Sequence, residues 1–581
     1  MRRAFRFRLR ILAGVLLFFA LFLITRLYFV QIVRGASYAL HGEHQYISSS
    51  QELYDRGTIY FTQKDGTLIS AATLATGFLI AIDPEELKNQ ESVYTKLSSL
   101  LSLSHTAFLA SAAKSTDSYE VLAHQVSEAQ GQAISDLNIP GVLVERERWR
   151  VYPAGSEAAQ TLGFVAYDNG NTLAGRAGLE KQYNDVLERP AEGLFGNFFA
   201  EIFANLDSVI VDARSAREGD VVTSIEPAVE QKLDQEIKAL NAQYSSTETA
   251  GIIMDPKTGE IIAMDSYPTF DPNNFKNGNP QYFGNGLVQH EYEFGSILKS
   301  LTMASGLDAG VIQPDTTYND TGCIHPNNTK VCNYDHVARG VIPMKQILFQ
   351  SLNVGAAFIA DSLGHTRMRT YFTKLGMGEK TGIDLPAEPL GNIRNLNTNQ
   401  DVNYDTAAFG QGIALTPVEM IRALGALANG GTIVTPHITK TILLPTGVQK
   451  VIPYAAPVEV FKPQSVNEVT TMLSQVFVND AELARASNPG LPIPRVTVAA
   501  KTGTAQVVNP NGGYYQNVFF HSFVGYFPTK NPRFIILLYT NRPQGVKYAS
   551  GTLTKTFMDL TNFLVNYYDI PPDTGPYADA S

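Results

Sequence analysis

Apolar and polar positions along this chain follow two different periods. After a helix-start sequence at 224–227, the apolar residues Val229, Leu233, Ile237 and Leu240 recur at spacings of four, four and three, which predicts a helix with one apolar stripe. Other segments alternate with a period of two around glycine-containing turns, as hairpin strands do. The predicted strands are 58–61, 68–71, 141–151, 250–254, 260–264, 495–500, 521–527 and 533–540, and the predicted helical stretches are 92–137, 296–427 and 552–567. In the second half of the chain, strands at both ends enclose the helices, which predicts an α+β fold whose end strands join one sheet.

The amino-terminal segment predicts a membrane anchor. Residues 11–33 are almost entirely apolar and interrupted only by Arg26, and about 23 residues are enough to cross a bilayer. Five arginines and no acid precede this run, so we expect the amino terminus in the cytoplasm and the rest of the chain outside. A cleaved signal peptide is the alternative. We disfavour it because the run is long and its small-residue cluster at 35–37 follows Arg34.

The composition narrows the class of protein further. The formal net charge of the 581 residues is −10, and the chain beyond the first ten residues is more acidic still. This balance argues against nucleic acid as the main ligand, because phosphate binding needs clustered cations. Two cysteines exclude a disulfide-rich scaffold. The histidines show no His-Glu-x-x-His spacing, and we predict neither a metal nor a cofactor.

A serine and a lysine three residues apart are the first candidates for chemistry. In Ser296-x-x-Lys299 the spacing places both side chains on one face of a helix, so the lysine amine can reach the serine hydroxyl. A serine hydroxyl becomes a good nucleophile when a neighbour accepts its proton, and a lysine can do so when its pKa is lowered. The motif alone is weak, because Ser111-x-x-Lys114 also matches it.

Two further motifs follow in a fixed order. Ser351-x-Asn353 comes about 55 residues later, and the sequence Lys-Thr-Gly-Thr at 501–504 about 150 residues after that, behind an apolar segment that predicts a sheet edge beside the serine. Each motif has a decoy elsewhere. Lys-Thr-Gly recurs at Lys257 and Lys380, which we interpret as turn and loop residues. The order and setting of the set, rather than any one motif, carry the signal.

This ordered set resembles the class B penicillin-binding proteins, the monofunctional peptidoglycan D,D-transpeptidases of division and elongation. Shorter motifs extend the resemblance over nearly the whole chain, although Phe294 stands where the family usually has proline, and the usual Leu-x-Gly after Tyr183 is absent. The supporting motifs are Arg56-Gly57-Thr58-Ile59, Arg150-x-Tyr152-Pro153-x-Gly155, Gly178-Leu179-Glu180-x-x-Tyr183, 266–273, 381–386, Gly410-Gln411-Gly412 and 523–526. The resemblance implies a transpeptidase domain of the serine β-lactamase type, with an antiparallel sheet flanked by helices, behind an elongated pedestal domain.

The resemblance also implies domain boundaries. We expect a basic cytoplasmic tail at 1–10, the anchor at 11–33, the pedestal at 34–223, the transpeptidase domain at 224–570 and a loose tail at 571–581. An apolar segment at 194–206 is expected to pack on the body, and contact with the bilayer or a partner is the alternative.

The resemblance further implies a function for each motif residue. Ser296 would attack a stem peptide ending in D-Ala-D-Ala, with Lys299 as its base, Ser351 as a proton relay and Lys501 keeping the local field positive. The residues expected to bind the stem peptide or a β-lactam are Asn353, Thr502, Gly503 and Thr504. The expected partners are stem peptides, β-lactams, the lipid bilayer and a SEDS-type glycosyltransferase.

Other functions share the same motifs. A D,D-carboxypeptidase, a membrane-tethered β-lactamase and a β-lactam sensor remain alternatives, and in the first two water rather than an amine would complete the reaction. A different class of hypothesis makes the chain mainly a scaffold for the polymerase. We prefer the enzyme because all three motifs are intact.

Cys323 and Cys332 lie nine residues apart between the first two motifs. A cross-linked loop is the favoured interpretation outside the cytoplasm. A zinc site with His325 and His336, or two free thiols, are the alternatives.

Overall fold

The computed structural model describes residues 55–114, 116–167, 173–189 and 218–573. The predicted anchor, the apolar segment at 194–206 and most of the predicted tail lie outside these ranges. No helix within them combines the length and apolar character needed to span a bilayer. The described residues belong to two compact units, one containing 74–149 and the other containing 56–73, 150–189 and 218–573.

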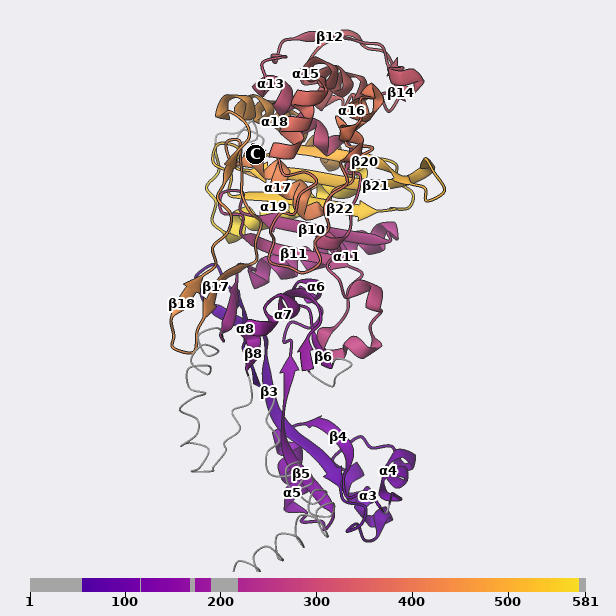
Figure 1. Ribbon diagram of the computed structural model, residues 1–581, viewed down its shortest axis with the longest axis vertical. Coiled ribbons are helices and arrows are strands. Elements are labelled where there is room, and N and C mark those ends of the chain that lie inside the picture. The colour runs from indigo at the N-terminus through magenta and orange to yellow at the C-terminus, as the bar shows by residue number, and fades with distance from the viewer. Residues whose placement is uncertain (1–54, 115, 168–172, 190–217, 574–581) are drawn as a thin grey trace, which may run out of the picture. The chain divides into compact units, whose positions relative to one another are not determined.

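A five-stranded sheet organises the larger unit (Figure 1). All its neighbouring strands are antiparallel, in the order β11-β10-β22-β21-β20. The strands are β10 (Glu248–Met254), β11 (Ile261–Tyr267), β20 (Ala499–Val508), β21 (Tyr514–Phe527) and β22 (Phe534–Asn541). The sheet confirms the predicted α+β class, and β20 confirms the predicted edge position of the Lys-Thr-Gly-Thr motif.

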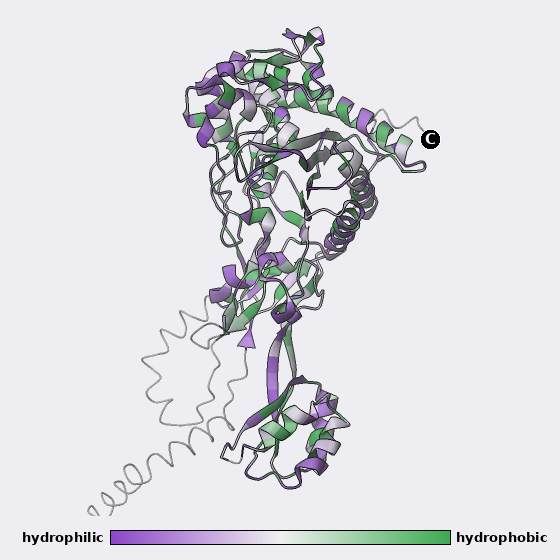
Figure 2. Ribbon diagram, turned by 90° about the vertical axis from the view of Figure 1, so that its right-hand side faces the viewer, coloured by the Kyte–Doolittle hydropathy of each residue, from purple (hydrophilic) through white to green (hydrophobic). Residues whose placement is uncertain are grey.

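Helices cover both faces of this sheet. Ile536 and Leu538 of β22 pack in one apolar cluster with α11 (Pro227–Tyr244) and α19 (Ser550–Tyr567), whereas Ile535 and Leu537 pack in another with α13 (Lys299–Asp308) and α17 (Pro417–Ala428). Successive side chains of a strand point to opposite faces, so a continuous apolar run fits a strand that is buried on both. Figure 2 shows hydrophilic and hydrophobic residues mixed within the helices of this unit.

The helix α11 forms as its sequence predicts. The Glu226 side chain accepts a hydrogen bond from the backbone N–H of Val229, and Pro227 occupies the first turn, where a missing N–H costs nothing. The four apolar residues of the predicted stripe are all buried. Truncating one of them, such as Leu233→Ala, would cost about 2–5 kcal/mol.

The central region is less helical than predicted. Four short strands interrupt 296–427 and pair as two antiparallel couples, one within the other in sequence. Cys323 and Cys332 lie directly opposite each other in the inner couple. The strands are β12 (Thr317–Asp320), β13 (Cys323–Ile324), β14 (Val331–Cys332) and β15 (Gly340–Pro343). Between β11 and β20 the α-helices are α12 (Gly286–Gln289), α13, α14 (Lys345–Phe349), α15 (Asn353–Lys374), α16 (Asp401–Ala407), α17 and α18 (Pro463–Ser487). The 3-10 helices there are η3 (Pro272–Asn277), η4 (Pro280–Tyr282), η5 (Gly295–Leu298), η6 (Pro326–Asn328) and η7 (Arg394–Asn397).

A buried ion network unites three of the motifs that are distant in sequence. Arg56 Nε and Arg150 Nε donate to the two carboxylate oxygens of Glu180 at 2.7 and 2.6 Å, and the Tyr152 hydroxyl donates to the same carboxylate at 3.2 Å. Burial would raise the pKa of Glu180, but Arg150 and Arg56 outweigh burial and lower it. The motifs at 56, 150 and 178 thus meet at one carboxylate.

Strands from both sides of residue 224 share a second sheet. β9 (Asp220–Thr223) pairs with β17 (Thr439–Leu443) and with β2 (Ile59–Thr62), which forms the predicted hairpin with β3 (Leu68–Ile82). The other elements of this unit are β1 (Asp55–Arg56), α6 (Ala159–Leu162), β6 (Val165–Tyr167), β7 (Leu173–Gly175), α7 (Gly178–Gln182), α8 (Asn184–Leu187), β8 (Glu188–Arg189), β16 (Thr432–Ile433), β18 (Gln449–Val451) and β19 (Val458–Glu459).

The smaller unit corrects the prediction of one helical stretch over 92–137. Ser104 and Ser127 each accept a hydrogen bond from a backbone N–H three residues on, so each begins a new helix. A strand precedes the second of these starts. The elements are α3 (Gln90–Ser98), α4 (His105–Ala112), β4 (Glu120–Val126), α5 (Glu128–Asp136) and β5 (Val142–Val151).

Candidate active site

Ser296 lies in a tight turn beside the edge strand β20. The turn η5 precedes α13, so the serine sits just before the helix on which the sequence places it. Gly295 has a φ of 63°, and a Cβ there would lie 3.1 Å from the backbone of Thr504. Its N–H donates to the carbonyl oxygen of Gly410 at 3.0 Å. Glycine therefore allows the turn to approach β20 closely.

Gly503 provides the matching space on β20. A Cβ at this position would lie 2.5 Å from the carbonyl oxygen of Phe294 and 2.3 Å from Oγ of Ser522. The Ser522 hydroxyl donates to that same carbonyl oxygen at 2.8 Å. The unusual Phe294 is buried against Phe520, so the missing family proline leaves the turn well packed. Gly503 thus has a packing function beside the predicted substrate-binding one.

Lys299 joins the first two motifs. Its Nζ donates to Ser296 Oγ at 2.9 Å, to the carbonyl oxygen of Ser351 at 2.7 Å and to Ser351 Oγ at 3.3 Å. The side chain is fully buried. Burial, and after it the nearby ammonium of Lys501, lower the pKa of Lys299 well below its usual value. The lowered pKa favours the neutral amine while Lys299 contacts the Ser296 hydroxyl.

Ser351 has an unusual backbone. Its φ of 55° lies in the left-handed region, which a residue with a side chain adopts at a cost of order 1–3 kcal/mol. Ser351 lies just before α15, and its carbonyl oxygen accepts a hydrogen bond from Lys299. Strained residues of this kind cluster at functional sites.

Lys501 is the second buried lysine of the site. Its Nζ donates to the carbonyl oxygen of Thr502 at 3.0 Å. Burial lowers its pKa to about 8, while the Asp480 carboxylate acts in the opposite direction. Burial raises the pKa of Asp480, which lies on α18 and lines the same cavity. Sequence reasoning missed Asp480, because no motif marks it.

The remaining predicted residues line the cavity. Asn353 Nδ2 donates to the carbonyl oxygen of Cys332 at 2.8 Å, so the asparagine also holds the neighbouring hairpin. Thr504 Oγ1 accepts from the backbone N–H of Ala549 at 3.0 Å. The structure thus brings together all three motifs. The decoys belong to other elements: Lys257 is in the turn between β10 and β11, Lys380 in a loop and Ser111 on α4.

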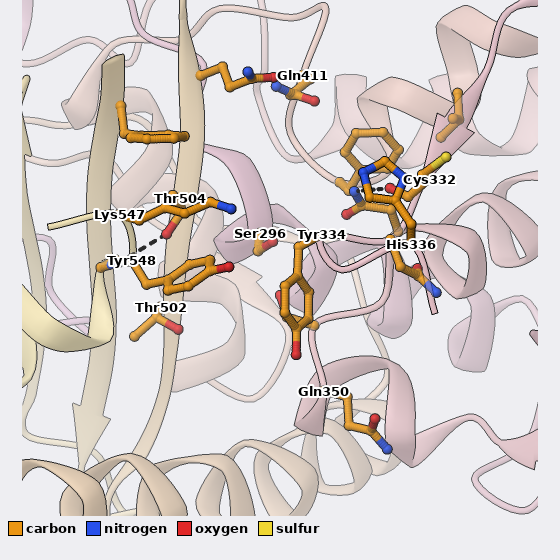
Figure 3. A pocket seen from close by; sticks show the side chains of 18 of the residues that line it. Ser296, Cys332, Tyr334, His336, Gln350, Gln411, Thr502, Thr504, Lys547 and Tyr548 are labelled. Carbon is orange, nitrogen blue, oxygen red and sulfur yellow. Dashed lines mark hydrogen bonds between the residues drawn. The ribbon is translucent and has the colours of Figure 1, made fainter. Parts of the chain in front are cut away.

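The cavity has a volume of about 870 Å³ and two walls. In Figure 3, Thr502, Thr504, Lys547 and Tyr548 lie on one side of Ser296, and Cys332 and His336 lie on the other. Tyr334 and Tyr548 were not predicted from the sequence.

Cys323 and Cys332 form a disulfide, which confirms the favoured interpretation of a cross-linked loop. The pair closes the hairpin of β13 and β14, whose last residue accepts the hydrogen bond from Asn353. The cross-link therefore belongs to a wall of the cavity.

A buried lysine in contact with a serine hydroxyl, at the edge of an antiparallel sheet, is an arrangement that serine enzymes use to activate their nucleophile. The family model for the penicillin-binding protein transpeptidase domain matches residues 249–561, and that for the penicillin-binding protein dimerisation domain matches 54–193. The first match alone covers more than half of the chain. The chain therefore belongs to the penicillin-binding proteins, with the two-domain arrangement of class B.

Curated relatives and solved structures agree with this family assignment. The chain is 27% identical to stage V sporulation protein D of Bacillus subtilis over 94% of its own length and 82% of the relative's. It is 24% identical to the peptidoglycan D,D-transpeptidase FtsI of Escherichia coli over 97% and 92%. The crystal structure of penicillin-binding protein 3 from Mycobacterium tuberculosis with aztreonam matches with a TM-score of 0.64 at 25% identity, covering 74% of this chain and 92% of that one.

Proposed function

We propose that this penicillin-binding protein is a peptidoglycan D,D-transpeptidase whose acyl-enzyme forms on Ser296. The observation that carries the proposal is the 2.9 Å contact between Lys299 Nζ and Ser296 Oγ, made by a fully buried lysine of lowered pKa. The name of the Escherichia coli relative, a peptidoglycan D,D-transpeptidase, supplies the reaction class.

In the first step, Ser296 Oγ attacks the carbonyl carbon of the penultimate D-Ala of a stem peptide, and Lys299 accepts the hydroxyl proton. We assign the oxyanion to the backbone N–H groups of Ser296 and Thr504. The close approach of Gly295 to the Thr504 backbone supports this assignment, because it places the two segments side by side.

The leaving group is the terminal D-Ala, which needs a proton on its amine. Ser351 is suited to pass that proton on, because its Oγ lies 3.3 Å from Lys299 Nζ. Lys501 keeps the local field positive. The amine of a second stem peptide then attacks the ester, and Ser296 regains its proton as the crosslink forms.

Four residues of the cleft are assigned to substrate. Asn353 would hydrogen-bond the stem-peptide backbone, and Thr502 and Thr504 would bind the terminal carboxylate of the stem or that of a β-lactam. Gly503 keeps this part of β20 close to the serine turn. All but Gly503 line the cavity.

The setting of this activity is part of the proposal. We assign 11–33 to a single membrane span, 34–223 to a pedestal and 224–570 to the transpeptidase domain outside the cytoplasm. A separate SEDS-type polymerase, contacted through the anchor and pedestal, would supply the glycan strands.

A crosslinking assay with purified protein tests the proposal. Glycan strands carrying D-Ala-D-Ala stems should yield crosslinks and free D-Ala with the unaltered chain. The Ser296→Ala variant should yield neither, and Ser111→Ala, which changes the decoy motif, should behave as the unaltered chain. Release of D-Ala without crosslinks would instead indicate a carboxypeptidase, and growth of cells that carry only Ser296→Ala would favour the scaffold hypothesis.

A further inference from the structure

Two exposed tyrosines meet across the mouth of the cleft. The rings of Tyr334 and Tyr548 lie 5.9 Å apart between centroids, with an interplanar angle of 80°. Tyr334 is 50% exposed and Tyr548 is 42% exposed, so core packing does not account for either ring. Figure 3 shows both side chains beside Ser296. The pair therefore links the two walls of the cavity.

The backbone next to each tyrosine is hydrogen-bonded to a different motif. Cys332, two residues before Tyr334, accepts from Asn353, and Asn333 Oδ1 accepts from the backbone N–H of Val354 at 3.1 Å. Asn333 Nδ2 also donates to both carboxylate oxygens of the buried Asp320. Tyr334 thus extends from a wall that is held at the start of α15.

Tyr548 is held equally firmly on the opposite wall. The N–H of Ala549 donates to Thr504 Oγ1, and the carbonyl oxygen of Lys547 lies 3.0 Å from Nε2 of the buried His521. The ammonium of Lys547 lies 5.1 Å from the centroid of the Tyr548 ring, and the guanidinium of Arg339 lies 6.0 Å from that of Tyr334. Both rings are therefore positioned by their own wall before any substrate binds.

We propose that Tyr334 and Tyr548 form an aromatic bridge over the acylated stem peptide that directs the ester on Ser296 toward an amine rather than water. The inference rests on the proposed function. A peptide strand lying along β20 would pass beneath the two rings, which would then lie over the ester carbonyl. Excluding bulk water from a reactive intermediate is a recognised consequence of closing an active site.

The two fates of the ester differ only in the nucleophile. An amine forms an amide bond to the acyl carbon, breaks the bond to Ser296 Oγ and gives its proton to that oxygen. Water forms a carboxylic acid by the same exchange. The ratio of amide to acid therefore reports what the bridge does, independently of how fast the ester forms.

The test uses the purified full chain in detergent, with a benzoyl-D-alanyl thioester as donor and free D-alanine as acceptor. We expect Tyr334→Ala and Tyr548→Ala each to lower the amide-to-acid ratio by about three- to tenfold, the fold-change that corresponds to the loss of one aromatic pair. The double variant should lose no more than the larger single effect, because the two rings act together. Tyr334→Phe, which keeps the ring, should restore the ratio.

Two controls separate this inference from the proposed function. Tyr167→Ala removes an exposed tyrosine of β6, outside the cleft, and should leave the ratio unchanged. Stoichiometric labelling by a fluorescent penicillin shows that each variant is folded and keeps a reactive serine. With labelling intact, an unchanged ratio in either single alanine variant, or multiplied effects in the double variant, would overturn the bridge. Loss of all acylation in the unaltered chain would overturn the proposed function instead.

Discussion

Lys299 Nζ lies 2.7 Å from the carbonyl oxygen of Ser351, a residue whose backbone is held in the left-handed region. The strained serine thereby aims a backbone acceptor at the amine of the first motif, while the same amine contacts Ser296 Oγ. In the proposed mechanism, the protonation state of this one buried nitrogen controls the nucleophile.

The pH dependence of acylation follows from the two buried lysines. Acylation by a penicillin should accelerate as pH rises through the lowered pKa of Lys299, because only the neutral amine accepts a proton. It should slow again above about pH 8, where Lys501 loses its charge. The measurement is the second-order labelling rate as a function of pH.

Replacing Lys501 tests which lysine causes the rise and which the fall of the labelling rate with pH. In Lys501→Gln the falling limb should vanish. The rising limb should move to higher pH, because one of the two influences that lower the pKa of Lys299 is gone. Lys380→Gln, which alters a loop lysine of the same tripeptide, should leave the profile unchanged. A rising limb that stays in place in Lys501→Gln would contradict the account.

Gly503→Ala tests the close approach of the serine turn to β20. The added Cβ meets the carbonyl oxygen of Phe294 and Oγ of Ser522, so we expect a loss of about 1–3 kcal/mol in unfolding free energy and slower penicillin labelling. The control is Gly425→Ala on α17, where the new Cβ would make an ordinary contact of 3.4 Å with Met254. Urea unfolding and labelling rates measure both effects, and equal behaviour of the two variants would count against the packing argument.

Glu180→Gln tests the buried ion network. The change removes the charge that the buried Arg56 and Arg150 both contact, which should cost about 3–5 kcal/mol of unfolding free energy. Glu236→Gln, in a partly exposed pair with Lys232, should cost less than about 1 kcal/mol. The stabilisation by Glu180 should be present above its ordinary pKa of 4.5 and be lost as pH falls through its lowered folded pKa. Urea unfolding as a function of pH measures it, and equal losses in the two variants would exclude a structural function of the network.

The disulfide makes a separate prediction. Thiol titration of the denatured protein should find no free thiol before reduction and two afterwards. Cys323→Ser with Cys332→Ser should lower the unfolding free energy by about 2–3 kcal/mol, the chain-entropy value for so short a loop, and should make stability insensitive to reductant. Two thiols without reduction would show that the pair is not bonded.

Local patterns predicted much of the larger unit. The start of α11 and the hairpins at 59–71 and 248–267 depend on residues close in sequence. The start of β20 at Ala499 was less predictable, because the N–H of Thr497 donates to the distant side chain of Asp573 instead of a neighbouring strand. The strand β4 was missed because the apolar residues around it also fit a helix.

The residues of the site likewise divide into those that the sequence predicted and those that only the structure shows. Motif order selected Ser296 over Ser111, since the chemistry of each motif is visible in its residue types. Asp480 and the pair of Tyr334 with Tyr548 could not be found by this route. The two tyrosines are more than 200 residues apart and exposed, so neither periodicity nor spacing marks them, and only tertiary structure brings them together.

The central claim is that the acyl group is carried by one serine hydroxyl. The most direct measurement is tandem mass spectrometry of the digested full chain after incubation with a penicillin. The account predicts a single added penicilloyl mass on the peptide that contains Ser296, retained in Ser111→Ala and absent from Ser296→Ala. An adduct on any other residue, or none in the unaltered folded protein, would contradict it.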